Sequence, residues 1–376
     1  MRIINEPELN LDDVLLMPQR TTLESRSQVQ LERELRFYHY PKHWVGVPFF
    51  AANLACLSSF ELGRALAKHK MCTALHKFHS PEQLINFYDE SPHEDQLFNF
   101  FDKDNKLSYV WVSIGMNDED ITNLEQVKKK IEASPNIVID VPNAYLEKFT
   151  KYCAKVRDAF PDSIIMAGNC ISGEIVQELI LHGGIDIVKI QIGNGKLCTT
   201  RLMTGVGRGT LSCIIECAGA AHGLKNGEKR LGLVCSDGGL YNTGDCSKAF
   251  CGGADFLMSG GLFYGVDEAC GEWEYEHILN PLDNVIHETI RKKRLKIYGM
   301  SSKESQIRHY GEYKKYRASE GRSQYADYKG KADEVVQELL GGLRSTATYI
   351  GANSLKDFNK CAVFCKVNQI HPNMSV

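Results

Sequence analysis

The amino-acid sequence predicts an α/β protein that folds as a (β/α)8 barrel, or TIM barrel. Eight short apolar runs, rich in Val, Ile and Phe, alternate with segments that have the apolar period of amphipathic helices. The runs are continuously apolar, as expected of parallel strands buried on both faces. A doubly wound sheet is the alternative. No Gly-x-Gly-x-x-Gly turn follows the first run, and the number of runs favours a closed barrel.

Each predicted strand is one of these runs. In chain order they are Val47–Ala55, Met71–Lys77, Tyr109–Gly115, Ile137–Val141, Ile164–Asn169, Asp186–Ile192, Leu231–Ser236 and Ala254–Ser259. A helix start is clearest at Ser80, an N-cap serine that is followed by Pro81 and Gln83. Further helices are expected at Tyr145–Phe160, Ile175–Leu181, Leu211–Gly223 and Ala332–Leu343.

No linker-like segment divides the chain, so we expect a single barrel domain over residues 1–376. A long polar, aromatic and charged stretch, approximately residues 263–330, follows the eighth strand. Such an insertion can close over the mouth of the barrel as a flap, although a plain solvent-exposed loop is the alternative. In these barrels the chemistry takes place on the loops after the strands, and phosphate commonly binds after strands seven and eight.

Composition argues against several classes of protein. A formal net charge of −3 gives no general attraction to nucleic acids or membrane surfaces. No run approaches the ~18 apolar residues that a membrane span needs. The thirteen cysteines never form a Cys-x-x-Cys pair, and the first ten residues lack the apolar core of a signal peptide. We therefore expect a cytoplasmic protein with no nucleic-acid or membrane partner.

Two glycine pairs follow the late strands, Gly238–Gly239 after the seventh and Gly260–Gly261 after the eighth. Because glycine has no side chain, backbone N–H groups at these positions can approach an anion closely. Both pairs are therefore candidate phosphate loops, with tight turns as the alternative. Asp237 could bind a ribose diol and Asp140 could meet a cofactor, or each carboxylate could cap the next helix.

Cys198 is the cysteine whose position indicates chemistry. It lies on a glycine-punctuated loop after the sixth strand, at the end of the barrel where catalytic residues occur. A thiol becomes a nucleophile when nearby cations or backbone dipoles favour the thiolate, and Lys196 and Arg201 could supply that field. A structural cysteine is the alternative.

Over nearly its whole length the chain resembles the IMP dehydrogenase/GMP reductase family. The matching stretches are Leu11–Leu16, Ala51–Asn53, His76–Lys77, Ala167–Asn169, Cys198–Arg201, Thr204–Gly207, Ser236–Gly239, Ala254–Phe256, Tyr298–Ser302, Tyr316–Gly321 and Leu343–Gly351. The resemblance implies a (β/α)8 barrel, usually assembled as a homotetramer. For the reductase branch it implies NADPH-dependent conversion of GMP to IMP and ammonia through a covalent thioimidate on Cys198, with Thr200 and Glu320 moving the proton.

The resemblance also assigns residues to ligands. Those implied for GMP are Asp237, Gly238, Gly239, Gly260, Gly261, Gly299, Met300, Ser301, Arg317, Ala318, Ser319 and Gly321. Those implied for NADPH are Ser25, Arg26, Lys77, Asp140, Val141, Ile192, Gly193, Tyr316, Ser345, Thr346, Ala347 and Thr348. The residues whose carbonyl oxygens would hold a potassium-like ion are Gly193, Gly195 and Cys198.

Two features favour the reductase branch. The chain has no room for the paired regulatory repeats that the dehydrogenase carries, and residues 317–321 read Arg-Ala-Ser-Glu-Gly where the dehydrogenase has an Arg-Tyr pair. Two alternatives stay open. One is another purine-nucleotide oxidoreductase, such as an IMP dehydrogenase, and the other is a catalytically weak nucleotide-binding barrel. The presence of Cys198, Thr200 and Glu320 argues against the latter.

Around these three residues the sequence departs from the family pattern. The altered positions are Leu54 and Ala55 (usually Met and Asp), Pro142 and Ala144 (Ala and Gly), Asn194 and Lys196 (Pro and Ser) and Ser259 (Leu). Lys196 could have taken over phosphate binding from the usual serine, or it could point to solvent. The segments Glu94–Lys106 and Glu272–Arg294 look longer than usual. Altered kinetics or nucleotide preference would be compatible with these changes.

Overall fold

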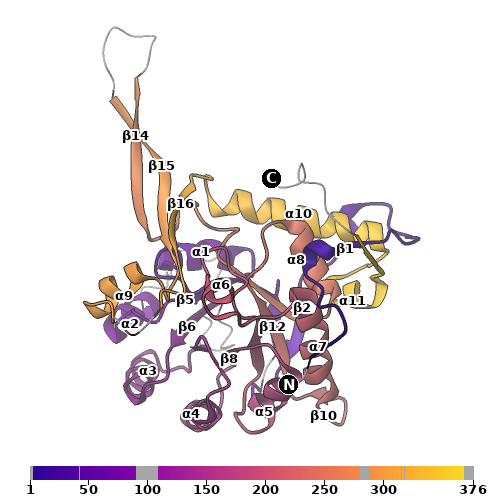
Figure 1. The fold of residues 1–376 in the computed structure, drawn as a ribbon, viewed down its shortest axis with the longest axis horizontal. Helices are drawn as coiled ribbons and strands as arrows, with labels where there is room; N and C mark the ends of the chain where they lie inside the picture. Colours follow the sequence, from indigo (N-terminus) through magenta and orange to yellow (C-terminus); the bar gives the residue numbers. More distant parts are fainter. Residues whose placement is uncertain are drawn as a thin grey trace.

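The computed structural model describes residues 3–41, 43–89, 109–279, 288–314, 316 and 318–367. Its central strands are β4 (Phe49–Ala51), β5 (Cys72–Leu75), β6 (Val110–Ile114), β7 (Ile137–Asp140), β8 (Ile165–Cys170), β9 (Ile187–Ile190), β12 (Leu233–Asp237) and β13 (Phe256–Ser259). They form a closed barrel in the order β12-β13-β4-β5-β6-β7-β8-β9, and every pair is parallel. All eight predicted strands are therefore confirmed, and so is the (β/α)8 fold (Figure 1).

Helices surround the barrel (Figure 1). They are α1 (Phe60–Lys68), α2 (Pro81–Asp89), α3 (Asp118–Ile131), α4 (Glu147–Ala159), α5 (Gly173–Leu181), α7 (Thr210–Gly223), α8 (Thr243–Cys251), α10 (Ala332–Ile350) and α11 (Phe358–Cys361). The predicted start at Ser80 is confirmed, because its hydroxyl accepts the Gln83 N–H at 3.2 Å while the Gln83 side chain accepts the Ser80 N–H at 2.9 Å. Helix α10 runs past its predicted end, since packing against α8 outweighs the weak helix propensity of the Gly341–Gly342 pair.

An antiparallel hairpin at the amino end of the strands was not predicted. It consists of β2 (Arg33–Arg36) and β3 (His43–Gly46). Its Trp44 is fully buried, and the indole packs on Phe256 of β13 at a centroid distance of 5.3 Å. Inside the barrel Phe50 packs on Trp111 at 4.9 Å. These aromatic contacts help to fill the interior of the barrel.

The predicted flap contains a three-stranded antiparallel sheet of β14 (Glu272–Leu279), β15 (Glu288–Tyr298) and β16 (Ser323–Asp327), together with helix α9 (Lys303–Tyr310). The β14–β15 hairpin projects well beyond the ring of helices (Figure 1). It accounts for one of the two segments that look long in the sequence. The other, residues 94–106, lies outside the described residues.

Short elements complete the chain. They are η1 (Leu11–Asp13), η2 (Arg26–Gln28), η3 (Leu355–Asp357), α6 (Thr200–Thr204), the pair β1 (Val14–Leu16) with β17 (Phe364–Lys366), and the pair β10 (Lys225–Asn226) with β11 (Lys229–Arg230). All thirteen cysteines are free. Within the described ranges, no helix combines the length and apolar character required to cross a membrane.

Candidate active site

The loop that carries Cys198 connects β9 to α6 and is joined to the flap by backbone hydrogen bonds. The Thr199 N–H donates to the Glu320 carbonyl at 2.8 Å, and the Arg322 N–H donates to the Leu197 carbonyl at 2.9 Å. Cys198 and Gly321 pair as an antiparallel bridge. The segment after α9 therefore runs alongside the loop like an added strand, which brings residues about 120 positions apart into contact.

Cys198, Thr200 and Glu320 form a continuous chain of polar groups. The Cys198 Sγ atom lies 3.2 Å from Thr200 Oγ1. The Thr200 hydroxyl donates to Glu320 Oε2 at 2.9 Å. All three side chains are half-buried, so a ligand at the barrel mouth can reach them. The arrangement can pass a proton between a reacting group at the thiol and the carboxylate.

Arg201 and Lys196, the two cations expected near the thiol, have their hydrogen bonds to other groups. The Arg201 guanidinium bonds Asn194 Oδ1 and the Arg208 carbonyl, and its Nε donates to the Ile192 carbonyl at 3.3 Å. Arg201 therefore braces the loop instead of bonding Cys198. The Lys196 side chain is exposed, while its carbonyl accepts two hydrogen bonds from Arg322 at 2.7 and 2.9 Å.

A buried amide network supports the loop from beneath, and the sequence did not indicate it. Gln191 is 1% exposed and has a φ of +97°, a backbone conformation that residues other than glycine rarely adopt. Its side chain accepts from Asn194 Nδ2 at 2.6 Å and donates to the Thr210 carbonyl at 3.0 Å. Asn194, which stands where the family usually has proline, thus restrains the loop through side-chain hydrogen bonds.

Asp140 and Asp237 meet at the buried ammonium of Lys189. Lys189 pairs with Asp140 Oδ1 and lies 3.1 Å from Asp237 Oδ2, which also accepts from Asn169 Nδ2 at 3.0 Å. Burial by itself would raise the pKa of Asp140, but Lys189, then Lys77 and a hydrogen bond with Asn53, outweigh burial and lower it. Burial would lower the pKa of Lys189, but the two carboxylates raise it above its ordinary value.

Lys189 and Asn169 were missed as site residues. A lysine inside the otherwise apolar stretch Ile187–Ile190 was the available signal, because a charged side chain in a buried strand needs a partner.

Three of the four glycines in the two glycine pairs, Gly238, Gly239 and Gly260, occupy positions where a side chain would be strained or crowded. Gly238 and Gly239 have φ values of +83° and +72°, and a Cβ on Gly238 would lie 3.1 Å from the Gly195 nitrogen. A Cβ on Gly260 would lie 2.7 Å from the Tyr264 hydroxyl. The Lys329 ammonium donates to the Gly261 carbonyl at 3.3 Å. A site for an anion between these loops is therefore chemically reasonable.

The flap residues implied for GMP lie around the Cys198 loop. A Cβ on Gly299 would be 3.1 Å from the Leu197 carbonyl and 3.4 Å from the Gly321 Cα. The Ser319 carbonyl accepts the Thr199 hydroxyl at 3.4 Å. Met300 packs against the core, whereas Ser301 and Ala318 are exposed. Arg317 lies outside the described residues. Tyr316, the flap residue implied for NADPH, is 78% exposed.

Two segments implied for NADPH lie elsewhere. Ser25 and Arg26 belong to the η2 turn, which contacts α10. Residues 345–348 lie on α10 itself, where the Thr346 hydroxyl is 2.8 Å from the Ser247 hydroxyl of α8. Neither segment lines the cavity beside Cys198. The residues that line it are Asn10, Leu11, Asp12, Asp13, Gly193, Asn194, Gly195, Lys196, Cys198, Arg201, Thr210, Gly239, Tyr241 and Arg322.

The remaining predicted cofactor residues lie at the barrel mouth. Lys77 is close to Asp140, and Val141 directly follows β7. Ile192 and Gly193 lie at the start of the loop that carries Cys198. The proposed ion ligands also face the cavity. Gly193 has a φ of +79°, and the Gly195 carbonyl accepts the Cys198 N–H at 2.9 Å. Asp12 and Asp13 line the same cavity.

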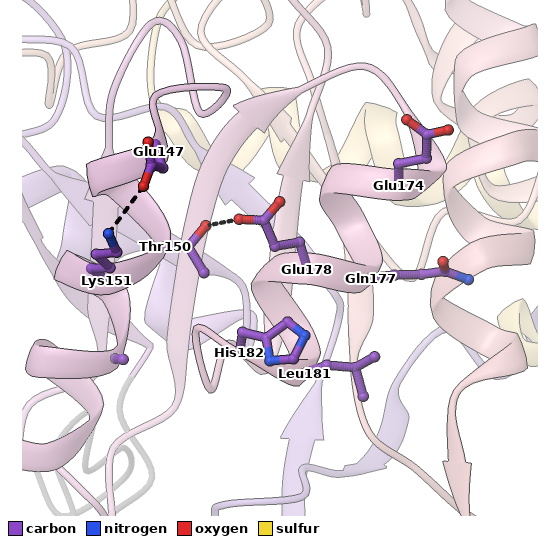
Figure 2. Close-up of a pocket in the computed structure, with 9 residues that line it drawn as sticks. Glu147, Thr150, Lys151, Glu174, Gln177, Glu178, Leu181 and His182 are labelled. Carbon is purple, nitrogen blue, oxygen red and sulfur yellow. Dashed lines mark hydrogen bonds and ion pairs between the residues drawn. The ribbon is translucent and has the colours of Figure 1, made fainter.

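A second cavity lies on the outside of the barrel, between α4 and α5 (Figure 2). Thr150 of α4 faces Glu178 of α5, and its hydroxyl donates to that carboxylate at 2.6 Å. Glu147 is paired with Lys151 at 3.0 Å. None of the predicted site residues lines this cavity. This cavity is thus separate from the predicted site.

Comparisons with known proteins give matches over nearly the whole chain. Residues 8–372 match the family model described as IMP dehydrogenase / GMP reductase domain. Over 374 residues the chain is 42% identical to a protein named GMP reductase from Shewanella pealeana, an overlap that covers 100% of this chain and 99% of the relative. A protein of the same name from Buchnera aphidicola is 42% identical over 369 residues, which cover 98% of this chain and 97% of the relative.

Proposed function

The chain belongs to the IMP dehydrogenase/GMP reductase family and is an oxidoreductase, and from this premise we propose that it reduces GMP to IMP and ammonia with NADPH. The observation that carries the proposal is the chain of contacts from Cys198 through Thr200 to Glu320. Amine expulsion from a purine needs a nucleophile and a proton for the departing nitrogen, and these three residues can supply both.

In the first half-reaction the Cys198 thiolate attacks carbon 2 of the purine, and a carbon–sulfur bond forms. Glu320, acting through Thr200, delivers a proton to the exocyclic amine, so that the carbon–nitrogen bond breaks and ammonia leaves. A thioimidate between Cys198 and the purine remains. Proton transfer from a positioned carboxyl group is what converts a poor leaving group into a viable one.

In the second half-reaction carbon 2 accepts a hydride, and the carbon–sulfur bond breaks to release IMP and the thiolate. NADPH supplies that hydride when bound. The sum is GMP, NADPH and two protons giving IMP, NADP+ and an ammonium ion. Lys77 and Asp140 with the backbone of Val141 would hold the cofactor beside the substrate, and the Gly193–Cys198 carbonyls would hold a potassium-like ion.

Substrate recognition follows from the same loops. Asp237 would accept hydrogen bonds from the ribose hydroxyls, and the two glycine pairs would receive the phosphate. Lys196 would add a charge there, because it lies close enough to Lys329 to help lower the pKa of that ammonium, after burial as the larger cause.

Assembly and compartment complete the proposal. Ser25, Arg26 and residues 345–348 would take part in cofactor binding only at the barrel mouth of a neighbouring subunit, which fits the homotetramer that the family resemblance implies. Thirteen free cysteines favour a reducing compartment, and we place the enzyme in the cytoplasm.

The test is to incubate purified protein with GMP and NADPH and to follow nicotinamide absorbance and ammonia together. We expect equimolar NADPH loss and ammonia release, with little turnover of IMP and NAD+. Cys198→Ala should still bind GMP but release no ammonia, because one half-buried sulfur contributes little packing. Robust IMP oxidation without GMP reduction would assign the dehydrogenase activity instead. Ammonia release by Cys198→Ala at a comparable rate would refute the covalent mechanism.

A further inference from the structure

Lys189 belongs neither to the residues implied for GMP nor to those implied for NADPH. Its side chain is 2% exposed, and its ammonium pairs with Asp140 at the end of β7 and with Asp237 at the end of β12. Asn169, on the intervening strand β8, donates to the same Asp237 oxygen at 3.0 Å and to the Gln191 carbonyl at 2.9 Å. One buried cluster thus spans four neighbouring strands of the barrel, β7, β8, β9 and β12.

The charges of this cluster depend on each other. Two carboxylates at one end of the barrel repel each other unless a cation lies between them, and Lys189 is the ammonium within ion-pairing distance of both among the described residues. A buried charge that loses its partner is strongly disfavoured. The orientation of the Asp140 and Asp237 carboxylates therefore rests on the same side chain.

We propose that Lys189 is a positioning residue shared by the two ligand sites, which holds Asp237 as the acceptor for the nucleotide's ribose and Asp140 as a contact of the nicotinamide cofactor. This inference rests on the proposed function, since it takes the two ligands from it. It differs from a structural role in one respect. A lysine that only stabilised the barrel would leave both affinities unchanged once the protein is folded.

The experiment measures binding of GMP and of NADP+ separately, by calorimetry, in Lys189→Met. Methionine fills similar space without the charge. We expect both dissociation constants to rise by about tenfold or more, the effect of losing a hydrogen bond to a charged group. Unchanged constants in a folded variant would overturn the proposal. A loss confined to one ligand would overturn the shared role.

Arg157→Met is the matched control. Arg157 is 8% exposed and pairs at 2.5 Å with Asp186, which directly precedes β9, so it is a buried cation at the opposite end of the strand that carries Lys189. Its removal should lower thermal stability and leave the GMP and NADP+ dissociation constants within about twofold of those of the wild type. If Arg157→Met and Lys189→Met weakened the binding of GMP and NADP+ equally, Lys189 would have only a structural role and the proposal would be wrong.

A double variant guards against misfolding. In Lys189→Met/Asp140→Asn one of the two carboxylates left without a cation is removed along with the ammonium, so stability should recover in part, while GMP binding should stay weak because Asp237 still lacks its cation. Recovery of GMP affinity in the double variant would contradict the proposal. Failure of the proposed function is separable, because it would show as absence of GMP turnover by the wild type.

A pH series adds a readout that a structural role would not move. Lys189 is the main group that lowers the pKa of Asp140, so the loss of its ammonium should raise that pKa. NADP+ binding by Lys189→Met should therefore weaken at a higher pH than NADP+ binding by the wild type when the solution is acidified. Parallel pH profiles would contradict the role assigned to the ammonium.

Discussion

Thr200 lies between the Cys198 thiol and the Glu320 carboxylate, which is 120 residues further along the chain than Thr200. Its hydroxyl is the only donor a threonine side chain has, and that donor is directed at Glu320 Oε2. The oxygen lone pairs remain available to the Cys198 side. In the proposed mechanism these contacts form a relay, in which Glu320 supplies the proton through Thr200.

Glu320→Gln keeps the shape of the side chain and removes its proton-transfer capacity. General acid–base catalysis typically contributes ~10²–10⁴ in rate, so the chemical step should slow by about that factor while the GMP dissociation constant changes little. Single-turnover measurement of ammonia release checks the step directly. Glu312→Gln, an exposed flap carboxylate, is the control and should behave as the wild type. Unchanged turnover by Glu320→Gln would mean that Thr200 or solvent handles the proton alone.

The flap is a folded element that is hydrogen-bonded to the loop that carries Cys198. In β15 the side chains of Leu295, Ile297 and Tyr298 are buried, so the base of the hairpin packs on the protein while its outer part projects. Arg322 then holds the loop through two hydrogen bonds to the Lys196 carbonyl. The position of Glu320 beside Thr200 therefore depends on how firmly this element is docked.

Arg322→Gln should loosen that docking without unfolding the barrel. Two charge-assisted bonds are lost, but the side chain is exposed, so we expect turnover to fall only several-fold, on the order of fivefold to tenfold. Limited proteolysis should cut the flap faster, while the thermal transition of the barrel stays in place. Lys314→Gln removes an exposed flap charge and serves as the control. Wild-type turnover in Arg322→Gln would show that backbone pairing alone positions the flap.

Across the whole molecule, a cluster of histidines links the barrel to the flap. The His76 and His79 rings stack at 3.9 Å, and Phe78 between them in sequence stacks on His309 of α9 at 3.8 Å. Burial, then His79 and His309, lower the pKa of His76 to about 3. Burial is also the main cause that lowers the pKa of His79 and of His309. These rings are therefore neutral in the folded protein near neutral pH.

Acidification should destabilise the fold through this cluster. An unfolded histidine takes up a proton near pH ~6.5, whereas the folded His76 resists protonation until about 3, so its stabilisation is present above ~6.5 and is lost as the pH falls through that interval. We expect the free energy of unfolding, from urea titrations between pH 7 and 5, to decrease by up to ~1.4 kcal/mol per pH unit for each such histidine. His76→Phe should flatten the slope, and parallel profiles would contradict the assignment.

Local patterns in the sequence determined the eight strands, the capped start at Ser80 and the glycine turns after β12 and β13. Burial on both faces makes a parallel strand apolar throughout, and an N-cap needs only residues within one helical turn, so a short window contains the information. The resemblance of the strand-end motifs supplied Thr200 and Glu320 as partners of Cys198. That prediction named the residues, whereas the distances from Cys198 to Thr200 and from Thr200 to Glu320 came only from the structure.

Only the tertiary structure decided which distant groups meet. The hairpin that buries Trp44, the docking of the flap on the Cys198 loop and the sharing of Lys189 between Asp140 and Asp237 all join separate segments of the chain. Lys189 is 49 residues from Asp140 and 48 from Asp237, so the sequence around Lys189 does not indicate which carboxylates it pairs with. Closure of the barrel sets these distances, because strand register and tilt fix where each side chain emerges at the mouth.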